Sequence, residues 1–377
     1  MNGRVSFLFS SMLNTYSELA KHTALARPVY EPGKPIEVVA RECDLDPDLI
    51  LKMASNENPL GATPLGMKAA LAMLDSVNLY PENSSLFLRE ALALKRGVSP
   101  DELVIGHGSS EIINLLAETY INSETEVVVG EYAFFSYKLA TLANGGRCIE
   151  VAMPNFQHNL KAIAEAVTSA TRLIFLPSPN NPTGTANSES ELVELVESLP
   201  EHVILCFDEA YAEYLDDPPD LRALIKAGRK VICLRTFSKI YGLAGMRIGY
   251  GYCHRDLAEI LNRVRFAFNV NSIAQAAALG ALKDDSFVER SRAINHAGLV
   301  QLEEGLDCLG LEWVPSKANF LLVRVENSKR VVDFLQTNGI IVRPLNGYSL
   351  SDYLRITVGT KGQNNRLLET LEDCIGG

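Results

Sequence analysis

The chain has 377 residues, of which 47% are hydrophobic and 21% charged, and its formal net charge is −11. One hydrophobic core rarely supports this length, so we expect a soluble globular protein with one large and one smaller domain. The acidic balance and the lack of any basic run of five or more residues argue against nucleic acid or an anionic membrane as a partner.

Cysteines and histidines bear on the compartment and on metals. The seven cysteines are scattered and lie mostly in apolar runs, which is typical of reduced thiols in a cytoplasm. No two of them have metal-ligand spacing and the six histidines do not cluster, so we predict no metal site. Residues 5–13 are too short to span a bilayer; we interpret them as an extension or arm, with a secretory signal as the alternative.

The first part of the chain contains loops, short helices and one short strand. Residues 19–35 are predicted to be loop-like, and the proline-rich residues 27–35 are interpreted as a strap over another surface. A strand from residue 51 runs into a polar turn with Asn56 and Asn58, which either satisfy local backbone groups or border a substrate pocket. Tyr80 precedes a proline and is therefore extended, so its phenol either anchors a loop or projects away from its own domain.

An anion site is indicated between a predicted strand, 103–105, and a predicted helix, 112–120. The intervening glycines are followed by Ser109 and Ser110, and free backbone N–H groups at a helix start favour a phosphate. The glycine spacing lacks the full dinucleotide pattern, which disfavours a nicotinamide site. Helix capping by serine is the alternative explanation of the motif.

Two further predicted strands end in candidate ligand-binding residues. Strand 126–129 is followed by an aromatic cluster that contains Phe134, and strand 173–176 is followed by a proline-rich turn that contains Asn181. Core packing is the ordinary explanation of the aromatic cluster. A ring in this position could instead stack on a planar cofactor.

A carboxylate ends the next strand. The apolar run 203–207 stops at Asp208, and Tyr211 follows three residues later. A carboxylate at the end of a hydrophobic strand is costly unless it is paired, and a protonated pyridine nitrogen would be a suitable partner. If the chain turns there, Tyr211 could reach the phenolic oxygen of the same cofactor.

A lysine directly after a strand indicates covalent cofactor chemistry. The apolar run 231–234 leads to Thr236, Ser238 and Lys239. Desolvation disfavours the ammonium form, so such a lysine can condense with an aldehyde near neutral pH. The neighbouring hydroxyls and Arg247 are donors suited to a phosphate dianion. Together these residues suggest pyridoxal phosphate, although a lone lysine in a turn is usually an ordinary surface residue.

The alternation of strands and helices predicts an α/β fold with a mostly parallel sheet. In such folds ligands gather at the carboxyl ends of the strands. The candidates that follow predicted strands are therefore expected to share one crevice: Ser109, Ser110, Phe134, Asn181, Asp208, Tyr211 and Lys239.

A long helical region, roughly residues 256–308, is predicted to cross to the smaller domain. There Arg355 alternates with apolar residues in a strand, so its guanidinium is either paired or reserved for an anionic substrate. We predict an N-terminal extension and arm over residues 1–50, a large cofactor-binding domain over 51–275 and a small domain over 276–377.

The motifs together resemble a known family. The aspartate aminotransferase superfamily of fold-type I pyridoxal-phosphate enzymes is matched by Asn181-Pro-Thr-Gly184, Asp208-x-x-Tyr211, Ser238-Lys239 and Arg247. Histidinol-phosphate aminotransferases are matched by Ser55-Asn-Glu-Asn-Pro59, Tyr80-Pro81, Gly108-Ser-Ser-Glu111, Val342-Arg-Pro344 and Tyr353-Leu-Arg-Ile-Thr-Val-Gly359. The resemblance begins at about residue 27 and implies a large domain with a mostly parallel seven-stranded sheet flanked by helices, plus a smaller α+β domain.

The resemblance implies catalytic roles for three residues. Lys239 would hold the cofactor through a Schiff base and, once displaced by substrate, would move the proton between the substrate and the cofactor. Asp208 would keep the pyridine nitrogen protonated, which makes the ring an electron sink. Tyr211 and Asn181 would bond the phenolic oxygen.

It also implies binding roles for the other candidates. Phe134 would stack on the ring, and the phosphate would be held by Ser109, Ser110, Thr236, Ser238 and Arg247. Tyr80 would reach the phosphate from the neighbouring subunit, which makes a homodimer part of the active site. Arg355 would bind the carboxylate of glutamate, and the second substrate would be placed by Tyr30, Arg343 and Asn181.

The implied reaction is amino transfer between glutamate and histidinol phosphate in cytoplasmic histidine biosynthesis. Leu60, His107 and the pair Tyr132-Ala133 depart from the family's common residues, which affects substrate shape more than cofactor chemistry. Three alternatives remain open: an aromatic amino-acid aminotransferase, a lyase similar to threonine-phosphate decarboxylases, and a non-enzymatic cofactor-binding protein.

Overall fold

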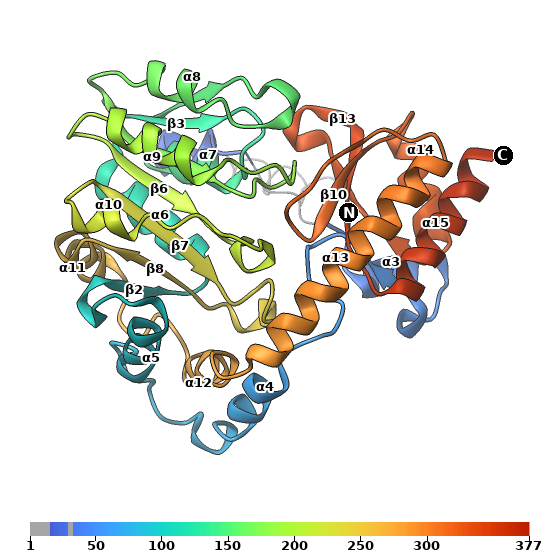
Figure 1. The fold of residues 1–377 in the computed structure, drawn as a ribbon, viewed down its shortest axis with the longest axis horizontal. Coiled ribbons are helices and arrows are strands. Elements are labelled where there is room, and N and C mark those ends of the chain that lie inside the picture. The colour runs from blue at the N-terminus through green and yellow to red at the C-terminus, as the bar shows by residue number, and fades with distance from the viewer. Residues whose placement is uncertain (1–15, 29–32, 377) are drawn as a thin grey trace, which may run out of the picture.

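The computed structural model describes residues 16–28 and 33–376. Tyr30 lies outside these residues. The larger part of the molecule is built on a seven-stranded sheet (Figure 1). The strands are β2 (Leu103–Gly106), β3 (Glu126–Gly130), β4 (Arg147–Val151), β5 (Thr171–Pro177), β6 (Ile204–Asp208), β7 (Val231–Thr236) and β8 (Gly249–Cys253).

Strand pairing confirms the predicted α/β fold. The order in the sheet is β2-β8-β7-β6-β5-β3-β4. β8 is antiparallel to β2 and β7, and every other neighbouring pair is parallel. Every residue of β2, β3, β6 and β7 is buried, as expected for nearly continuous hydrophobic strands that are covered on both faces.

Helices cover both faces of the large sheet, because successive apolar side chains of a strand point to opposite faces and both sets are buried. Ile174 and Leu176 of β5 enter one hydrophobic core, while Leu173 and Phe175 enter the other. The first core contains side chains from α5 (Leu86–Arg96), α8 (Leu160–Glu165), α9 (Glu189–Ser198), α10 (Arg222–Lys226) and α12 (Ser272–Ala281). The second contains side chains from α6 (Ser109–Tyr120), α7 (Ser136–Ala143) and α11 (Arg255–Val264).

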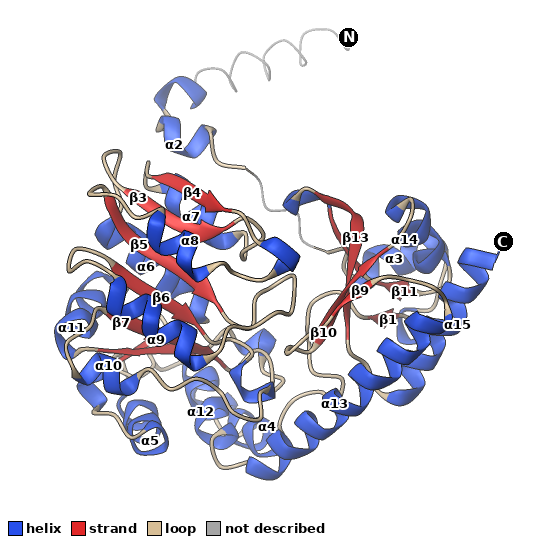
Figure 2. Ribbon diagram, turned by 45° about the horizontal axis from the view of Figure 1, so that its top comes forward, coloured by secondary structure: helices blue, strands red, loops and turns tan. Residues whose placement is uncertain are grey.

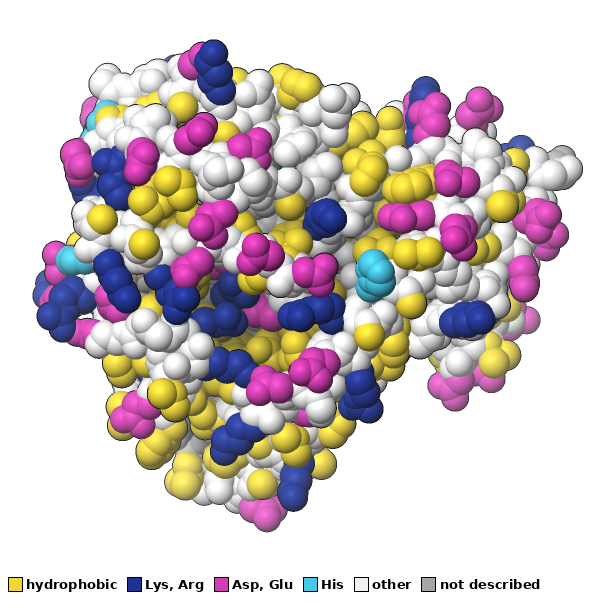
Figure 3. Space-filling model, viewed as in Figure 1, with side chains coloured by type: hydrophobic (Ala, Val, Ile, Leu, Met, Phe, Trp, Pro, Cys, Tyr) yellow, Lys and Arg dark blue, Asp and Glu magenta, His cyan; other side chains and the backbone are white. Residues whose placement is uncertain are grey.

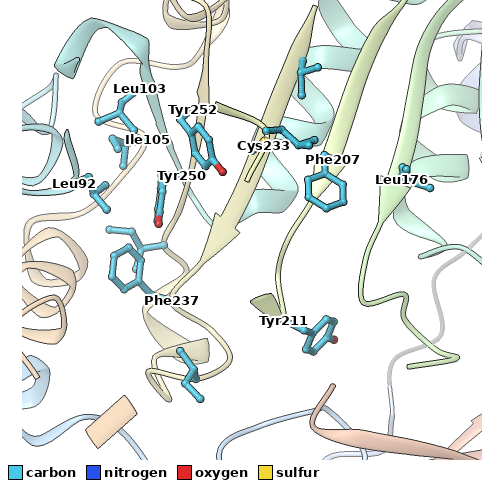
Figure 4. Packing of buried hydrophobic residues seen from close by; sticks show 14 of the residues in the cluster. Leu92, Leu103, Ile105, Leu176, Phe207, Tyr211, Cys233, Phe237, Tyr250 and Tyr252 are labelled. Atoms are coloured by element: carbon cyan, nitrogen blue, oxygen red, sulfur yellow. The ribbon is translucent and has the colours of Figure 1, made fainter. Parts of the chain in front are cut away.

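Figure 4 shows the first core from close by. Side chains from adjacent strands lie in one layer, and the strand residues labelled there include Leu103, Ile105, Leu176, Phe207, Cys233, Tyr250 and Tyr252. Tyr211 lies at the edge of this layer, beyond the end of β6. The core therefore extends up to the place where the strands end.

The second part of the molecule is a smaller α+β unit. Its antiparallel sheet has the order β12-β13-β10-β9, from β9 (Trp313–Val314), β10 (Phe320–Arg324), β12 (Arg343–Leu345) and β13 (Leu350–Thr357). It is covered by α13 (Asp285–Cys308), α14 (Ser328–Thr337) and α15 (Lys361–Gly376) (Figure 2). The predicted helical region of residues 256–308 consists of three helices, α11, α12 and α13, of which α13 crosses between the two parts (Figure 1).

An N-terminal segment packs with this C-terminal part. β1 (Leu51–Lys52) pairs in parallel with β11 (Ile340–Ile341), and α3 (Ile36–Cys43) shares a small apolar cluster with Ile341. The next helix, α4 (Pro64–Leu71), packs against α12 of the large part. The domain limits at residues 51 and 276 stay a prediction, and the pairing of β1 favours placing residues 36–52 beside the small domain.

The surface is mixed in charge. Acidic and basic side chains are interspersed over the face in Figure 3, without a large area of one sign. No helix among the described residues has the length and apolar character needed to cross a bilayer.

Candidate active site

A crevice of about 250 Å³ lies where the strands of the large sheet end and the small unit begins. It is lined by the predicted residues Ser109, Ser110, Phe134, Asn181, Asp208, Tyr211, Thr236, Ser238, Lys239, Arg247, Arg343 and Arg355. Most of these residues lie at or just after the ends of strands of the large sheet, which brings them together at one edge. Arg343 and Arg355 come instead from β12 and β13 of the small unit. The predicted residues therefore converge on one crevice, and their individual roles stay predictions.

Lys239 presents its amine inside the crevice. The residue follows β7, and its Nζ donates to the backbone oxygen of Ser55 at 3.3 Å. Nζ also lies 5.6 Å from the centre of the Tyr211 ring. Burial, followed by the positive charge of Arg355, lowers the pKa of Lys239 to about 7. A large fraction of this amine is therefore neutral and nucleophilic near neutral pH.

Asp208 presents a buried carboxylate at the end of β6. It accepts hydrogen bonds from the Tyr137 hydroxyl at 2.7 Å and from the Ala210 N–H at 3.1 Å. Burial raises the pKa of Asp208 to about 6, although both hydrogen bonds act in the opposite direction. Without them the carboxyl group would be protonated over a wider pH range.

The adjacent acid, Glu209, points to the opposite side of the chain from Asp208. Its carboxylate pairs with Arg235 at 2.8 Å and accepts from the Tyr252 hydroxyl at 2.8 Å. Both members of this ion pair are almost fully buried. Glu209 is thus satisfied within the core, which leaves Asp208 as the carboxylate that faces the crevice.

Tyr137 lines the crevice, although no individual role was predicted for it. Its ring stacks on Phe175 with centroids 4.8 Å apart and meets the edge of Phe134 at 5.7 Å. The residue belongs to the aromatic cluster noted after β3, and α7 turns it toward Asp208. The spacing of residues in the sequence could not identify this contact, because Tyr137 lies on α7 and its partner Asp208 lies 71 residues later, at the end of β6.

An anion cradle lies at the other side of the crevice. α6 begins at Ser109, so its free N–H groups and its dipole face the crevice. A Cβ at Gly108 would come within 2.5 Å of Nη2 of Arg247, and a Cβ at Gly249 would come within 2.5 Å of the Ser109 nitrogen. Both glycines therefore permit a close approach of donors. Nη1 of Arg247 donates to the Ser238 hydroxyl at 3.3 Å.

Two arginines of the small unit line the crevice side by side. Arg343 on β12 and Arg355 on β13 are directly opposite in the antiparallel register. Arg355 donates to the Asn181 side-chain oxygen at 2.6 Å and to the Ala54 backbone oxygen at 2.5 Å. Like charges at opposite positions repel, so this arrangement favours an anionic ligand between them.

Tyr80 lies outside the crevice of its own chain. Its side chain is 83% exposed and stacks on Phe268 with ring centroids 4.8 Å apart. The prediction that it acts from a neighbouring subunit remains a prediction. Tyr30, the other predicted residue missing from the crevice lining, is outside the described residues.

The donor set fits pyridoxal phosphate. The cradle of N–H groups, hydroxyls and Arg247 suits a phosphate, and the Gly108 and Gly249 contacts show that it is closely built. Lys239 offers a neutral amine for an aldehyde, and Asp208 offers a carboxylate for a ring nitrogen. Phe134 lines the same crevice and offers an aromatic face.

The family described as aminotransferase class I and II matches residues 49–371. The chain belongs to this family. A histidinol-phosphate aminotransferase of Methylobacillus flagellatus is 44% identical over 348 residues, which cover 92% of this chain and 94% of that protein. One of Akkermansia muciniphila is 41% identical and covers 94% of this chain and 98% of its own length.

Solved structures agree with the fold of this aminotransferase. A histidinol-phosphate aminotransferase of Sinorhizobium meliloti in complex with pyridoxal-5'-phosphate gives a TM-score of 0.87 at 26% identity, covering 95% of this chain and 97% of that one. An aspartate aminotransferase of Thermus thermophilus with maleate gives 0.79 at 22% identity, over 94% of this chain and 99% of that one. The predicted family resemblance and fold are confirmed.

Replacing Tyr137 with phenylalanine should move the pH profile of the aminotransferase. The change keeps the stacking on Phe175 and removes one hydrogen bond to the carboxylate, so the pKa of Asp208 rises. We expect the acid limb of kcat/KM to shift upward by about one pH unit, from the usual worth of a hydrogen bond to a charged group. Tyr132→Phe is the control, because it removes a hydroxyl from the same cluster without touching Asp208. A coincident profile for Tyr137→Phe and wild type would contradict this role.

The low pKa of Lys239 can be measured directly. In the apoenzyme, acetylation of Lys239 should rise with pH through about 7, because only the free amine reacts. The same peptide in the unfolded protein should titrate near the ordinary lysine value of about 10.4. Arg355→Gln should move the folded midpoint upward, since it removes a neighbouring positive charge. Mass spectrometry of the labelled peptide gives the midpoints, and equal folded and unfolded values would contradict the desolvation argument.

Proposed function

We propose that this chain is a pyridoxal-phosphate-dependent histidinol-phosphate aminotransferase of histidine biosynthesis. It would move an amino group between L-glutamate and imidazole acetol phosphate, with 2-oxoglutarate and histidinol phosphate as the other pair. The observation that carries the proposal is the meeting of Lys239, Asp208 and an anion cradle in one crevice. Support for the substrate comes from relatives of that name that are 41–44% identical over nine-tenths of the chain.

The residues divide the chemistry among them. Bound pyridoxal phosphate would supply an electron-withdrawing ring that stabilises negative charge on the substrate carbon that loses a proton. Asp208 would hold a proton on the ring nitrogen, and the hydrogen bond from Tyr137 favours the charged form of that carboxylate. Lys239 would hold the cofactor through its aldehyde, and its amine, once released by substrate, would carry a proton to and from the substrate Cα.

The two arginines explain how one pocket can accept two substrates. Glutamate carries two carboxylates, whereas histidinol phosphate carries a phosphate and no α-carboxylate. Arg343 and Arg355 lie opposite each other, and the forked donors of arginine suit both kinds of anion. The small unit would thus bind the anionic group while the large sheet holds the reacting atoms.

A homodimer with shared active sites is part of the proposal. Large apolar side chains close in sequence to Tyr80 or to its ring partner Phe268 are exposed, including Leu79, Phe87 and Phe266, and hydrophobic side chains lie along the lower part of the view in Figure 3. Such a patch is typical of a subunit interface. Tyr80 does not line the crevice of its own chain and would act in the crevice of the partner subunit. A cytoplasmic location fits the seven free cysteines.

Mixing two variant chains, each without activity at a limiting concentration of pyridoxal phosphate, tests the shared site. Lys239→Ala removes the amine, and Tyr80→Phe should weaken cofactor binding by about 10- to 100-fold through loss of a hydrogen bond to phosphate. A mixed dimer contains an intact site, formed by Lys239 of one chain and Tyr80 of the other. Activity should therefore appear on unfolding and refolding the two variants together. No gain over the separately refolded variants would contradict the shared site.

The reaction itself is tested by separate half-reactions of the purified holoenzyme. Glutamate should change the visible spectrum, and imidazole acetol phosphate should restore it with a higher kcat/KM than phenylpyruvate. Arg343→Gln should lower kcat/KM for the phosphorylated substrate by about 10- to 100-fold and affect phenylpyruvate less. A preference for phenylpyruvate would identify an aromatic aminotransferase instead. Release of CO₂ without any need for 2-oxoglutarate would identify a lyase.

A further inference from the structure

Asn56 occupies an unusual position between the two parts of the molecule. It is 1% exposed and has a left-handed backbone conformation, with φ of 56°. Asparagine and aspartate tolerate this conformation better than most residues. Its backbone oxygen accepts from the Asn319 side chain at 3.0 Å, and its backbone N–H donates to the Thr357 hydroxyl at 2.9 Å. The residue is therefore held from the small unit.

The direction of the next hydrogen bonds follows from these contacts. A backbone N–H only donates, so the Thr357 oxygen accepts from it and has its own proton left to give. That proton goes to Oδ1 of Asn56 at 3.2 Å. The amide is thereby oriented with Nδ2 toward the Tyr211 hydroxyl, 2.8 Å away. Because an amide nitrogen is a donor only, the Tyr211 oxygen accepts this bond and its proton must point elsewhere.

The remaining direction for the Tyr211 proton is the crevice. Tyr211 lines the crevice, and its ring is fixed edge-on against Phe320 at 5.3 Å. Within residues 16–28 and 33–376 the Tyr211 hydroxyl donates to no protein acceptor. A buried hydroxyl proton without an acceptor is costly, so the arrangement is suited to an acceptor supplied by a ligand.

A second side chain in the crevice is oriented from the same strand. Arg355 donates to Oδ1 of Asn181, which leaves the Asn181 amide nitrogen as a donor on its other side. Arg355 and Thr357 are two residues apart on β13 and therefore point to the same face. β13 thus sets the donor direction of both Asn181 and Tyr211.

Tyr211 has a proton to give near neutral pH. Burial raises the pKa of Tyr211 to about 12, while Arg355 and the hydrogen bond from Asn56 act in the opposite direction. The titratable or charged groups that surround it come from several elements: Asp208 of β6, Lys239 after β7, Arg355 of β13, Tyr214 of η5 (Ala212–Tyr214) and Tyr348 of η7 (Asn346–Tyr348).

We propose that Asn56, oriented by Thr357, is a positioning residue that makes Tyr211 a hydrogen-bond donor into the crevice. The acceptor would be the phenolic oxygen of bound pyridoxal phosphate, and this identity rests on the proposed function. A donor in this place stabilises the negative charge of that oxygen. That oxygen would then be less basic, so a proton held beside it would be lost at a lower pH.

Asn56→Asp tests this direction with a matched shape. Aspartate tolerates the same left-handed conformation, but its carboxylate accepts only and would draw the Tyr211 proton away from the crevice. The measurement is the midpoint of the pH-dependent change in visible absorption of the holoenzyme. We expect the Asn56→Asp midpoint to rise by about one unit or more, as for the loss of a hydrogen bond to a charged group. Cofactor affinity, measured by equilibrium dialysis, should fall.

The new negative charge of Asn56→Asp would raise the midpoint by itself, so a double-mutant cycle separates the two effects. In a Tyr211→Phe background there is no hydroxyl to reorient, and Asn56→Asp should then shift the midpoint much less. Thr357→Val should raise the midpoint, whereas Thr357→Ser, which keeps the hydroxyl, should leave it at the wild-type value. Circular dichroism and urea denaturation show whether each variant is folded.

Two outcomes would overturn the inference. Equal shifts from Asn56→Asp with and without the Tyr211 hydroxyl would show a charge effect alone, and an unmoved midpoint in folded Thr357→Val would remove Thr357 from the chain of bonds. A wild-type protein with a normal visible band leaves the proposed function intact in either case. A wild-type protein that binds no pyridoxal phosphate would refute the proposed function and this inference together.

Discussion

Desolvation at the ends of the parallel strands is the constraint on which this site depends. The same burial that lowers the pKa of Lys239 to about 7 raises that of Asp208 to about 6. The pKa values of an amine and of a carboxyl group are thus both brought close to neutral pH in one crevice. Neighbouring groups therefore decide the protonation state of each. The hydrogen bond from Tyr137 favours the charged carboxylate of Asp208, and the positive charge of Arg355 favours the neutral amine of Lys239.

The sheet and the small unit contribute different kinds of group to the crevice. The large sheet provides the amine, the carboxylate and the anion cradle, all at or just after the ends of buried strands. The small unit provides Arg343 and Arg355, and it also holds Asn181 through Arg355 and Asn56 through Thr357. Binding and orientation therefore both require that β13 be seated against the large sheet, which couples the two parts of the molecule through hydrogen bonds.

The sequence predicted the sheet and most of the crevice because both follow from local pattern. Apolar strands that end in polar residues must meet at one edge of a parallel sheet, so Asp208 and Lys239 could be placed without coordinates. Tyr137 and the orientation of Asn56 could not, since their partners are remote in sequence. The contact of β1 with β11 was also missed, because a two-residue strand has no periodicity to detect.

That pairing of β1 with β11 bears on how the polypeptide becomes ordered as it is made. Leu51 is matched with Ile340, and Met53 donates to the backbone oxygen of Ile341. During synthesis from the N-terminus the backbone groups of residues 51–53 have no hydrogen-bond partner until nearly the whole chain has left the ribosome. The large sheet, whose strands span residues 103–253, can assemble before them. The loop that carries Asn56 is therefore among the last parts of the crevice to take its final form.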